Sequence, residues 1–311
     1  MRMMGQLAWL LFGGIAVLLI LWWAPDKPVQ QLYTQYAQAP SQFAQVNGLT
    51  VHYRIEGMTT AAPPLILLHG TSASLHTWDG WVKELQDQRQ IIRLDLPGFA
   101  LTGPRQDDDY RVETYANFVA DFASALGIET FDLGGNSLGG FIAWKTAEFY
   151  PERVSRLILV DPSGGYEWNP EELPLGFRIA QAPILSYSME YFTPKFMIRR
   201  SVENVYGDPS LVTDELVQLY YDMTLREGNR RALRLRFKLQ QSRDESETLR
   251  TLSQPTLILW GGRDTLIPVA NAHKYAADIP NNVLVIFPEL GHVPHEEAPV
   301  QTADAVRAFL R

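Results

Sequence analysis

The residues in this sequence that first suggest chemistry are a serine placed between glycines. The pentapeptide GNSLG at residues 135–139 has the pattern G-x-S-x-G, with an apolar run before it and a run of helical spacing after it. An abrupt strand-to-helix turn strains the backbone of Ser137, so small residues are needed on both sides. Such a turn exposes the hydroxyl as a nucleophile for acyl transfer, whereas the pentapeptide alone could also be a glycine-rich turn with an incidental serine.

Two backbone N–H groups are expected to stabilise the oxyanion that this attack produces. The N–H of Leu138 lies at the positive end of the helix that follows the serine. The apolar run at residues 65–68 opens into a loop of small residues, HGTS at 69–72. Because a tetrahedral intermediate needs two converging donors, the N–H of Thr71 is the natural second one. We interpret His69 as structural.

The general base is predicted to be His292. It follows the last apolar run and a short loop, which returns it to the same sheet edge as Ser137. His295 is the alternative, but it lies where a helix is expected to begin. The run HVPHEE at residues 292–297 lacks the H-E-x-x-H spacing of a zinc helix, and its proline interrupts such a helix. We therefore predict no metal.

The acid that orients this histidine is predicted to be Asp264. It ends an apolar run in the turn WGGRD, where two glycines let a carboxylate reach across to His292. Asp161 is the competitor, because it also follows an apolar run and could reach the same space from the neighbouring strand. The chain order nucleophile, acid, base favours Asp264, which leaves Asp161 as a structural cap of the turn after it.

Short apolar runs predict the strands that must position these residues. Their composition is that of buried parallel strands, and they lie at residues 65–68, 91–94, 131–133, 157–160, 256–260 and 283–287. Residues 45–55 predict a hairpin that turns at Asn47-Gly48. Apolar spacings of three and four predict helices at residues 116–126, 139–149 and 300–310. This alternation predicts an α/β fold with a doubly wound, mostly parallel sheet.

Residues 163–252 break the alternation and predict an inserted helical cap. The core is thereby divided into a first part, residues 43–162, and a second part, residues 253–311. Aromatic side chains of the cap could line an apolar acyl pocket or pack the cap on the core; they are Tyr187, Tyr191, Phe192, Phe196 and Tyr206. A basic cluster is interpreted as a solvated helix face, with an anionic substrate or lipid headgroup as the alternative contact; it comprises Arg226, Arg230, Arg231, Arg234, Arg236 and Lys238.

An uncharged apolar run occupies residues 5–24, after a flank at residues 1–4. A helix of about 20 apolar residues matches a hydrocarbon core about 30 Å thick, and Trp22-Trp23 would lie in the interfacial aromatic belt. We predict a single-pass N-terminal transmembrane helix that anchors the protein to the membrane. A signal peptide cut near Ala24 and a buried core helix are the alternatives.

Residues 25–42 then form a linker without a firm apolar period. The slight bias between Arg2, before the apolar run, and Lys27, after it, predicts a cytoplasmic N-terminus. The catalytic domain is accordingly expected outside the cytoplasm, in the periplasm of a bacterium.

Composition excludes several classes of function. A chain of 311 residues with 46% hydrophobic and 20% charged residues can bury a core, so it is expected to be globular. A formal net charge of -8 gives no basic footprint for nucleic acid. The absence of cysteine excludes disulfides, thiolate metal sites and cysteine nucleophiles.

Five motifs in this order resemble the α/β-hydrolase superfamily over residues 43–311. Besides GNSLG they are His69-Gly70, Asp95-Leu96-Pro97-Gly98, Gly261-Gly262-Arg263-Asp264 and Gly291-His292. The resemblance implies a structural role for the Asp95 turn and oxyanion donors at Thr71 and Leu138. It also separates the chain from the family's epoxide hydrolases and haloalkane dehalogenases, which have aspartate where Ser137 stands.

The activity implied is hydrolysis of a carboxylic ester, esterase-like or lipase-like, through an acyl-enzyme on Ser137 without a cofactor. The expected substrate is a small-molecule or lipid-like ester, with the membrane contacted through residues 5–24. A carbon–carbon bond hydrolase of the meta-cleavage type is the alternative enzyme, since it resembles this chain in cap position and serine triad. A non-catalytic, membrane-tethered binding module is the third possibility, and the oligomeric state stays open.

Overall fold

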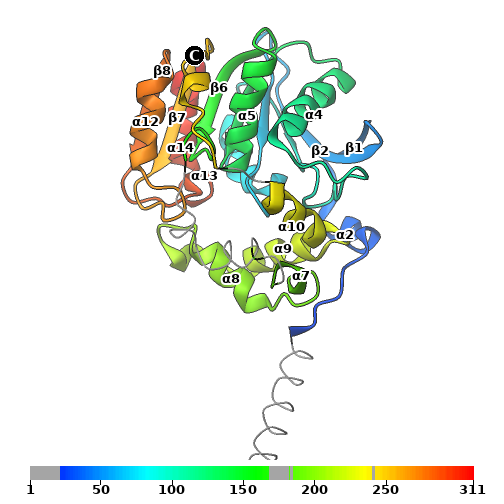
Figure 1. Cartoon of the computed structure of the whole chain (residues 1–311). Coiled ribbons are helices and arrows are strands. Elements are labelled where there is room, and N and C mark those ends of the chain that lie inside the picture. Colours follow the sequence, from blue (N-terminus) through cyan, green and yellow to red (C-terminus); the bar gives the residue numbers. More distant parts are fainter. Residues whose placement is uncertain (1–21, 168–181, 183–184, 240–241) are drawn as a thin grey trace, which may run out of the picture.

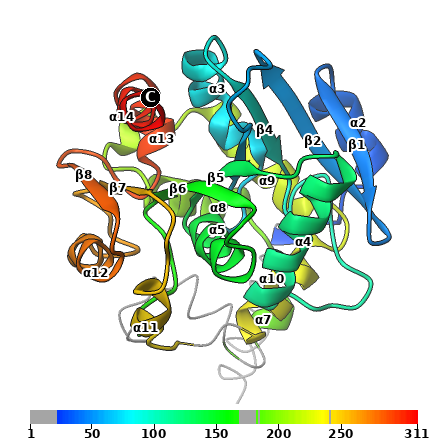
Figure 2. The same cartoon turned by 90° about the horizontal axis from the view of Figure 1, so that it is seen from above.

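A single eight-stranded sheet forms the centre of the molecule, with helices on both faces (Figures 1 and 2). The computed structural model describes residues 22–167, 182, 185–239 and 242–311. The strand order is β1-β2-β4-β3-β5-β6-β7-β8. The strands are β1 (Ser41–Val46), β2 (Leu49–Gly57), β3 (Leu65–Leu68), β4 (Gln90–Leu94), β5 (Phe131–Asn136), β6 (Val154–Val160), β7 (Thr256–Gly261) and β8 (Asn282–Phe287).

The pairing of the strands confirms the mostly parallel sheet. Strands β1 and β2 form the predicted antiparallel hairpin, and Asn47 and Gly48 at its turn both have positive φ. Strand β2 is also antiparallel to β4. From β4 through β3 to β8, all neighbours are parallel. Their carboxyl ends therefore meet at one edge, where loops after the strands can bring side chains together.

Two apolar clusters pack the helices on the sheet. One face carries α4 (Val112–Ala125), α5 (Leu138–Phe149) and α12 (Ala270–Asp278), and the other carries α3 (Asp79–Leu85) and α14 (Pro299–Leu310) (Figure 2). The residues of β3, β6 and β7 alternate between the two clusters, so both faces of these strands are buried. This explains why their sequences are continuous apolar runs. The three helices expected from apolar spacing overlap α4, α5 and α14, and only residue 126 of the first lies beyond the end of its helix.

The long segment between β6 and β7 forms a helical layer over the carboxyl ends of the strands (Figure 1). No strand occurs in its described portions. Helix α8 is amphipathic and contacts α9. The helices are α7 (Leu185–Ser188), α8 (Lys195–Glu203), α9 (Asp214–Leu225), α10 (Asn229–Leu239) and α11 (Ser246–Leu249).

The segment expected to be a linker instead contains a helix, α2 (Val29–Tyr36), that packs on the body. Val29 and Leu32 are buried, and with Tyr33 and Tyr36 they recur at the helical spacing i, i+3, i+4, i+7. Glutamines between these positions hide the period in the sequence. The interpretation of residues 25–42 as a linker without a firm apolar period did not include this helix of eight residues.

Most of the predicted anchor, residues 5–21, lies outside the described residues. Within the described ranges, no helix has the length and apolar character needed to cross a bilayer. Trp22, Trp23 and Ala24, at the end of the apolar run, are described and contact the cap.

Candidate active site

Ser137 lies at the junction of β5 and α5, in the sharp turn that its sequence predicts. Its φ is 54° and its ψ is -116°, a strained conformation for a residue with a Cβ. The glycines on either side are required for space. A Cβ on Gly135 would lie 2.2 Å from the carbonyl oxygen of Gly139, and a Cβ on Gly139 would lie 2.2 Å from that of Leu68.

His292 and Asp264 are brought together from the loops after β8 and β7. His292 Nδ1 lies 2.7 Å from Asp264 Oδ2, and both residues are buried. Asp264 Oδ1 accepts hydrogen bonds from the backbone N–H groups of Leu266 at 2.7 Å and Ile267 at 3.0 Å. These bonds fix the carboxylate, so His292 donates through Nδ1 and keeps Nε2 as a proton acceptor.

His292 Nε2 is buried and has no hydrogen-bond partner among the described residues. His292 and Ser137 line the same cavity. The side chain of Asn136, at the end of β5, holds the His292 loop against the sheet. Its Nδ2 donates to the carbonyl oxygen of His292 at 2.9 Å and to that of Val160, at the end of β6, at 3.2 Å. This arrangement leaves Nε2 available to a serine hydroxyl or a substrate.

The two expected oxyanion donors come from the segments that meet at Ser137. Leu138 is the first residue of α5, where a backbone N–H has no partner within the helix. The loop after β3 lies close to Ser137, since a Cβ on Gly70 would lie 3.2 Å from the Cβ of Ser137. Thr71 lines the cavity with Ser137. Their roles as donors stay predictions.

Asp161, the competing acid, lies beside Asp264 and does not replace it. It follows β6 with φ 43°, and its Oδ1 accepts the N–H of Gly261 at 2.9 Å. Atoms of Asp161, Asp264 and His292 all lie within 4.8 Å of one another. Burial, and then the charge of Asp264, raise the pKa of Asp161 well above its ordinary value.

Two buried carboxyl groups this close disfavour a second negative charge, which accords with a protonated Asp161. Three such ligands could in principle surround a cation. However, His292 Nδ1 already faces Asp264, so the arrangement favours a proton on Asp161 beside the histidine–aspartate pair. Sequence reasoning recognised Asp161 as a rival of Asp264 but not as its partner.

The other histidines near the site have structural contacts. His295 is fully buried, with its ring 4.2 Å from the ring of Trp78 and Nε2 at 2.8 Å from Thr77 Oγ1. Burial, with a smaller effect of His292, lowers the pKa of His295 to about 3. His69 accepts the N–H of Leu96 at 2.9 Å through Nε2. Both rings therefore stay neutral and hold loops in place.

Two carboxylates after His292 join its loop to the cap, and sequence reasoning assigned them no role. Glu297 accepts the N–H of Gly291 at 2.6 Å and that of Gly207 at 2.8 Å. Glu296 accepts the hydroxyls of Tyr206 at 2.5 Å and Tyr220 at 2.9 Å. The only signal in the sequence is a pair of acidic residues directly after the histidine motif.

The cavity that contains Ser137 has a volume of about 310 Å³. Core and cap both contribute apolar walls, which include Phe141, Met189, Phe192, Ile198, Val202, Leu233, Phe237 and Ile267. Of the five cap aromatics proposed for an acyl pocket, only Phe192 lines the cavity. Tyr187, Tyr191 and Phe196 are exposed, and Tyr206 is buried in an apolar cluster between cap and core.

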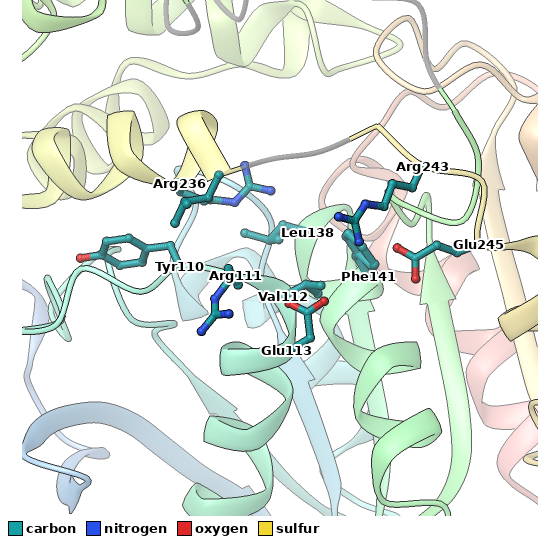
Figure 3. Close-up of a pocket in the computed structure, with 10 residues that line it drawn as sticks. Tyr110, Arg111, Val112, Glu113, Leu138, Phe141, Arg236, Arg243 and Glu245 are labelled. Carbon is teal, nitrogen blue, oxygen red and sulfur yellow. The ribbon is translucent and has the colours of Figure 1, made fainter.

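A second cavity of about 330 Å³ adjoins the first and is more polar (Figure 3). Phe141, Arg236, Arg243 and Glu245 line both cavities. Figure 3 shows Arg236 and Arg243 on the cap side of this space, with Glu113 on the opposite side. A substrate at Ser137 could therefore extend from an apolar space into a polar one.

The basic cluster of the cap is not the solvated face that was expected. Arg230 is buried and donates to Asp26 and to the carbonyl oxygen of Ala24, each at 2.7 Å. Arg231 and Arg234 form ion pairs with Asp108 and Glu190. Arg236 is also buried. The acidic partners come mainly from distant segments, which the helical spacing of the arginines cannot reveal.

Comparison with known proteins agrees with this geometry. A family model described as alpha/beta hydrolase fold matches residues 63–192. An uncharacterized protein of Mycobacterium tuberculosis is 31% identical over 283 residues, which cover 86% of this chain and 80% of that protein. The 2-hydroxymuconate semialdehyde hydrolase of a Pseudomonas species is 28% identical, over 79% of this chain and 86% of that enzyme.

Among solved structures, a membrane phospholipase A described as a bacterial virulence factor has a TM-score of 0.74 and 27% identity. The match covers 99% of this chain and 95% of that one. Sequence identity of 31% over most of both chains, the order of the strands and the strained serine turn lead to one conclusion. The chain belongs to the α/β-hydrolase family.

Proposed function

We propose that this protein is a serine hydrolase that cleaves carboxylic esters with an apolar acyl group. The observation that carries the proposal is the shared cavity of Ser137 and His292, with Asp264 bonded to His292 at 2.7 Å. A nucleophile, a base and a group that orients the base are the parts that acyl transfer requires.

In this mechanism His292 Nε2 removes the proton of Ser137 as the hydroxyl oxygen attacks the ester carbonyl. The N–H groups of Thr71 and Leu138 stabilise the oxyanion of the tetrahedral intermediate. His292 then gives the proton to the leaving alcohol, which produces an acyl-enzyme. Water, deprotonated by the same nitrogen, releases the acid and restores the serine.

The apolar walls of the cavity support an apolar acyl group, because burial of each methylene contributes about 0.8 kcal/mol. The similarity to a membrane phospholipase A over nearly the whole chain supports a lipid-like ester. The word membrane in the description of that phospholipase also supports our proposal that residues 5–24 anchor the protein to a membrane. The positions of Arg2 and Lys27 on either side of this run are the basis for our proposal that the catalytic domain lies outside the cytoplasm.

Hydrolysis of a carbon–carbon bond is the second candidate. Its support is the 28% identity to 2-hydroxymuconate semialdehyde hydrolase. The polar cavity beside Ser137, with Arg243 and Arg236 in its wall, would also suit an anionic diketone.

A direct comparison of substrates separates the two. The full-length protein in detergent is assayed with p-nitrophenyl esters from acetate to decanoate and with a meta-cleavage-type vinylogous diketone acid, with Ser137→Ala as the control. We expect kcat/KM to rise with acyl length, by up to roughly fourfold per methylene, and to exceed that for the diketone. A higher kcat/KM for the diketone would replace the ester assignment with carbon–carbon hydrolysis.

A further inference from the structure

Apolar side chains are concentrated on one exposed part of the cap. Seven of the fourteen large hydrophobic residues exposed in the described part of the chain lie here, each 36–57% exposed. We define them as the cap patch: Trp22, Trp23, Leu185, Tyr187, Tyr191, Phe196 and Met197. An apolar group of this size on a folded domain indicates a contact surface.

Contacts between the N-terminal residues and the cap join four members of this patch, Trp22, Trp23, Tyr191 and Phe196. The ring of Trp23 stacks on Tyr191 with centroids 5.8 Å apart and meets Phe192 edge-on at 5.7 Å. Trp22 lies 6.2 Å from Phe196 of α8. The N–H of Ala24 donates to the carbonyl oxygen of Tyr191 at 2.9 Å. In Figure 1 the described chain begins beneath α7 and α8, on the side away from the sheet.

We propose that the cap patch lies against a lipid bilayer. The uncharged apolar run of residues 5–24 has its last aromatic residues, Trp22 and Trp23, in the patch, so the described chain begins there. Tryptophan and tyrosine are the residues enriched at membrane interfaces. Two exposed cations, Lys195 and Arg200, flank Phe196 on α8 and complement anionic headgroups.

The patch also continues into the wall of the Ser137 cavity. Met197 belongs to the patch and lines the cavity. Phe192, which contacts Trp23, lines the cavity as well. An acyl chain can therefore move from the bilayer towards Ser137 along apolar side chains without entering water. This delivery of the acyl chain to Ser137 rests on the proposed ester hydrolysis, whereas the contact of the patch with the bilayer does not.

The absence of cysteine from the chain allows the contact to be measured directly. Single variants Leu185→Cys and Phe196→Cys carry a nitrobenzoxadiazole label on the patch. Val283→Cys and Val300→Cys, in β8 and α14, are matched controls, because these residues are equally apolar and are 53% and 56% exposed. The full-length proteins are reconstituted in phosphatidylcholine–phosphatidylglycerol vesicles that contain lipids with spin-labelled acyl chains.

We expect the spin labels to quench the patch probes at least twofold more strongly than the control probes. Equal quenching at all four positions would overturn the proposal, because the body would then stand away from the bilayer. Failure of the protein to float with the vesicles would overturn it as well.

Kinetics test the delivery of substrate. The double variant Leu185→Ser/Phe196→Ser should lose at least fivefold of its activity on a long-chain ester in vesicles and keep its activity on soluble p-nitrophenyl butyrate. Val283→Ser/Val300→Ser should keep both activities. Equal losses on both substrates would contradict delivery through the patch. No ester hydrolysis by the wild type would refute the proposed function, while the quenching experiment would still decide whether the patch contacts lipid.

Discussion

The carboxyl groups of Asp264 and Asp161, both beside His292, have different hydrogen-bond partners. This difference indicates a different role for each. Asp264 accepts two backbone N–H groups and the imidazole, so its negative charge is stabilised. Asp161 accepts one N–H, and its other oxygen is buried without a partner among the described residues. A charged Asp264 that holds His292 and a neutral Asp161 that supports Asp264 follow from these contacts.

Replacement of Asp264 should therefore impair catalysis far more than replacement of Asp161. In Asp264→Asn the amide can donate to His292 Nδ1, which favours the wrong tautomer, and kcat should fall by about 10⁴. Asp161→Asn retains a neutral donor beside Asp264, so its kcat should stay within about tenfold of the wild type. Steady-state kinetics at pH 7 with a p-nitrophenyl ester measures kcat of both variants. Equal losses of kcat would refute the assignment of Asp264 as the residue that orients His292.

Asp161 also predicts a dependence of stability on pH. Because its folded-state pKa lies above the ordinary value of 3.8, the folded protein retains a proton that the unfolded chain releases. The resulting destabilisation is absent below pH 3.8 and increases as the pH rises towards the folded-state pKa.

Asp161→Asn removes this effect. Its free energy of unfolding relative to the wild type should therefore increase between pH 4 and pH 7, with a limiting slope of about 1.4 kcal/mol per pH unit. Urea denaturation at several pH values measures the difference, and a difference that does not change with pH would contradict a protonated Asp161.

At the scale of elements, the turn from β5 into α5 depends on close backbone contact. Gly139 lies on the carbonyl of Leu68, so α5 can approach β3 only without a side chain at this position. Gly127, after α4, is a useful contrast, since no atom lies within 4 Å of a Cβ placed there, although its φ is 70°. Gly139 is therefore required for the close packing of α5 on β3, whereas Gly127 is required only for the positive φ of its own backbone.

Gly139→Ala should consequently lower the free energy of unfolding by about 3 kcal/mol, because the added Cβ meets backbone that cannot move freely. Gly127→Ala should cost about 1 kcal/mol, the strain of positive φ alone. Chemical denaturation of both variants tests this, and a similar loss in the two would show that the approach of α5 to β3 is not tight.

The sequence predicts the core elements well and the cap contacts poorly, for a physical reason. Buried parallel strands leave continuous apolar runs, and the serine turn needs its glycines at fixed spacing, so β3 to β8 and the Ser137 motif are local patterns. Helix α2 is amphipathic, but its glutamines obscure the period. The carboxyl pair of Asp161 and Asp264 depends on the side-by-side placement of β6 and β7, which neither local sequence contains.

At the scale of the whole molecule, the N-terminal segment is fastened to the cap by contacts between residues about 200 positions apart. Lys27 donates to buried Asp222 at 2.6 Å, and the hydroxyl of Tyr36 donates to the same carboxylate at 2.6 Å. Arg230 binds Asp26 on the same segment. These contacts fix where the chain enters the folded body, and hence the position of the cap patch.

Asp222→Asn should therefore lower the free energy of unfolding by about 1–2 kcal/mol, since the ion pair with partly exposed Lys27 is lost and one oxygen is replaced by a donor. Asp304→Asn, which removes an exposed ion pair with Arg307 on α14, should change it by less than about 0.5 kcal/mol. Denaturant titration compares the two. An equal effect would show that the N-terminal segment is not held by this contact.

The central claim is that Ser137 is a nucleophile activated by His292, and covalent labelling tests it most directly. The full-length protein in detergent is treated with a fluorophosphonate probe beside Ser137→Ala, His292→Ala and the structural control His295→Gln. We predict labelling of the wild type, complete loss in Ser137→Ala, strong loss in His292→Ala and retention in folded His295→Gln. Absence of labelling in folded wild-type protein, or undiminished labelling of Ser137→Ala, would contradict the account.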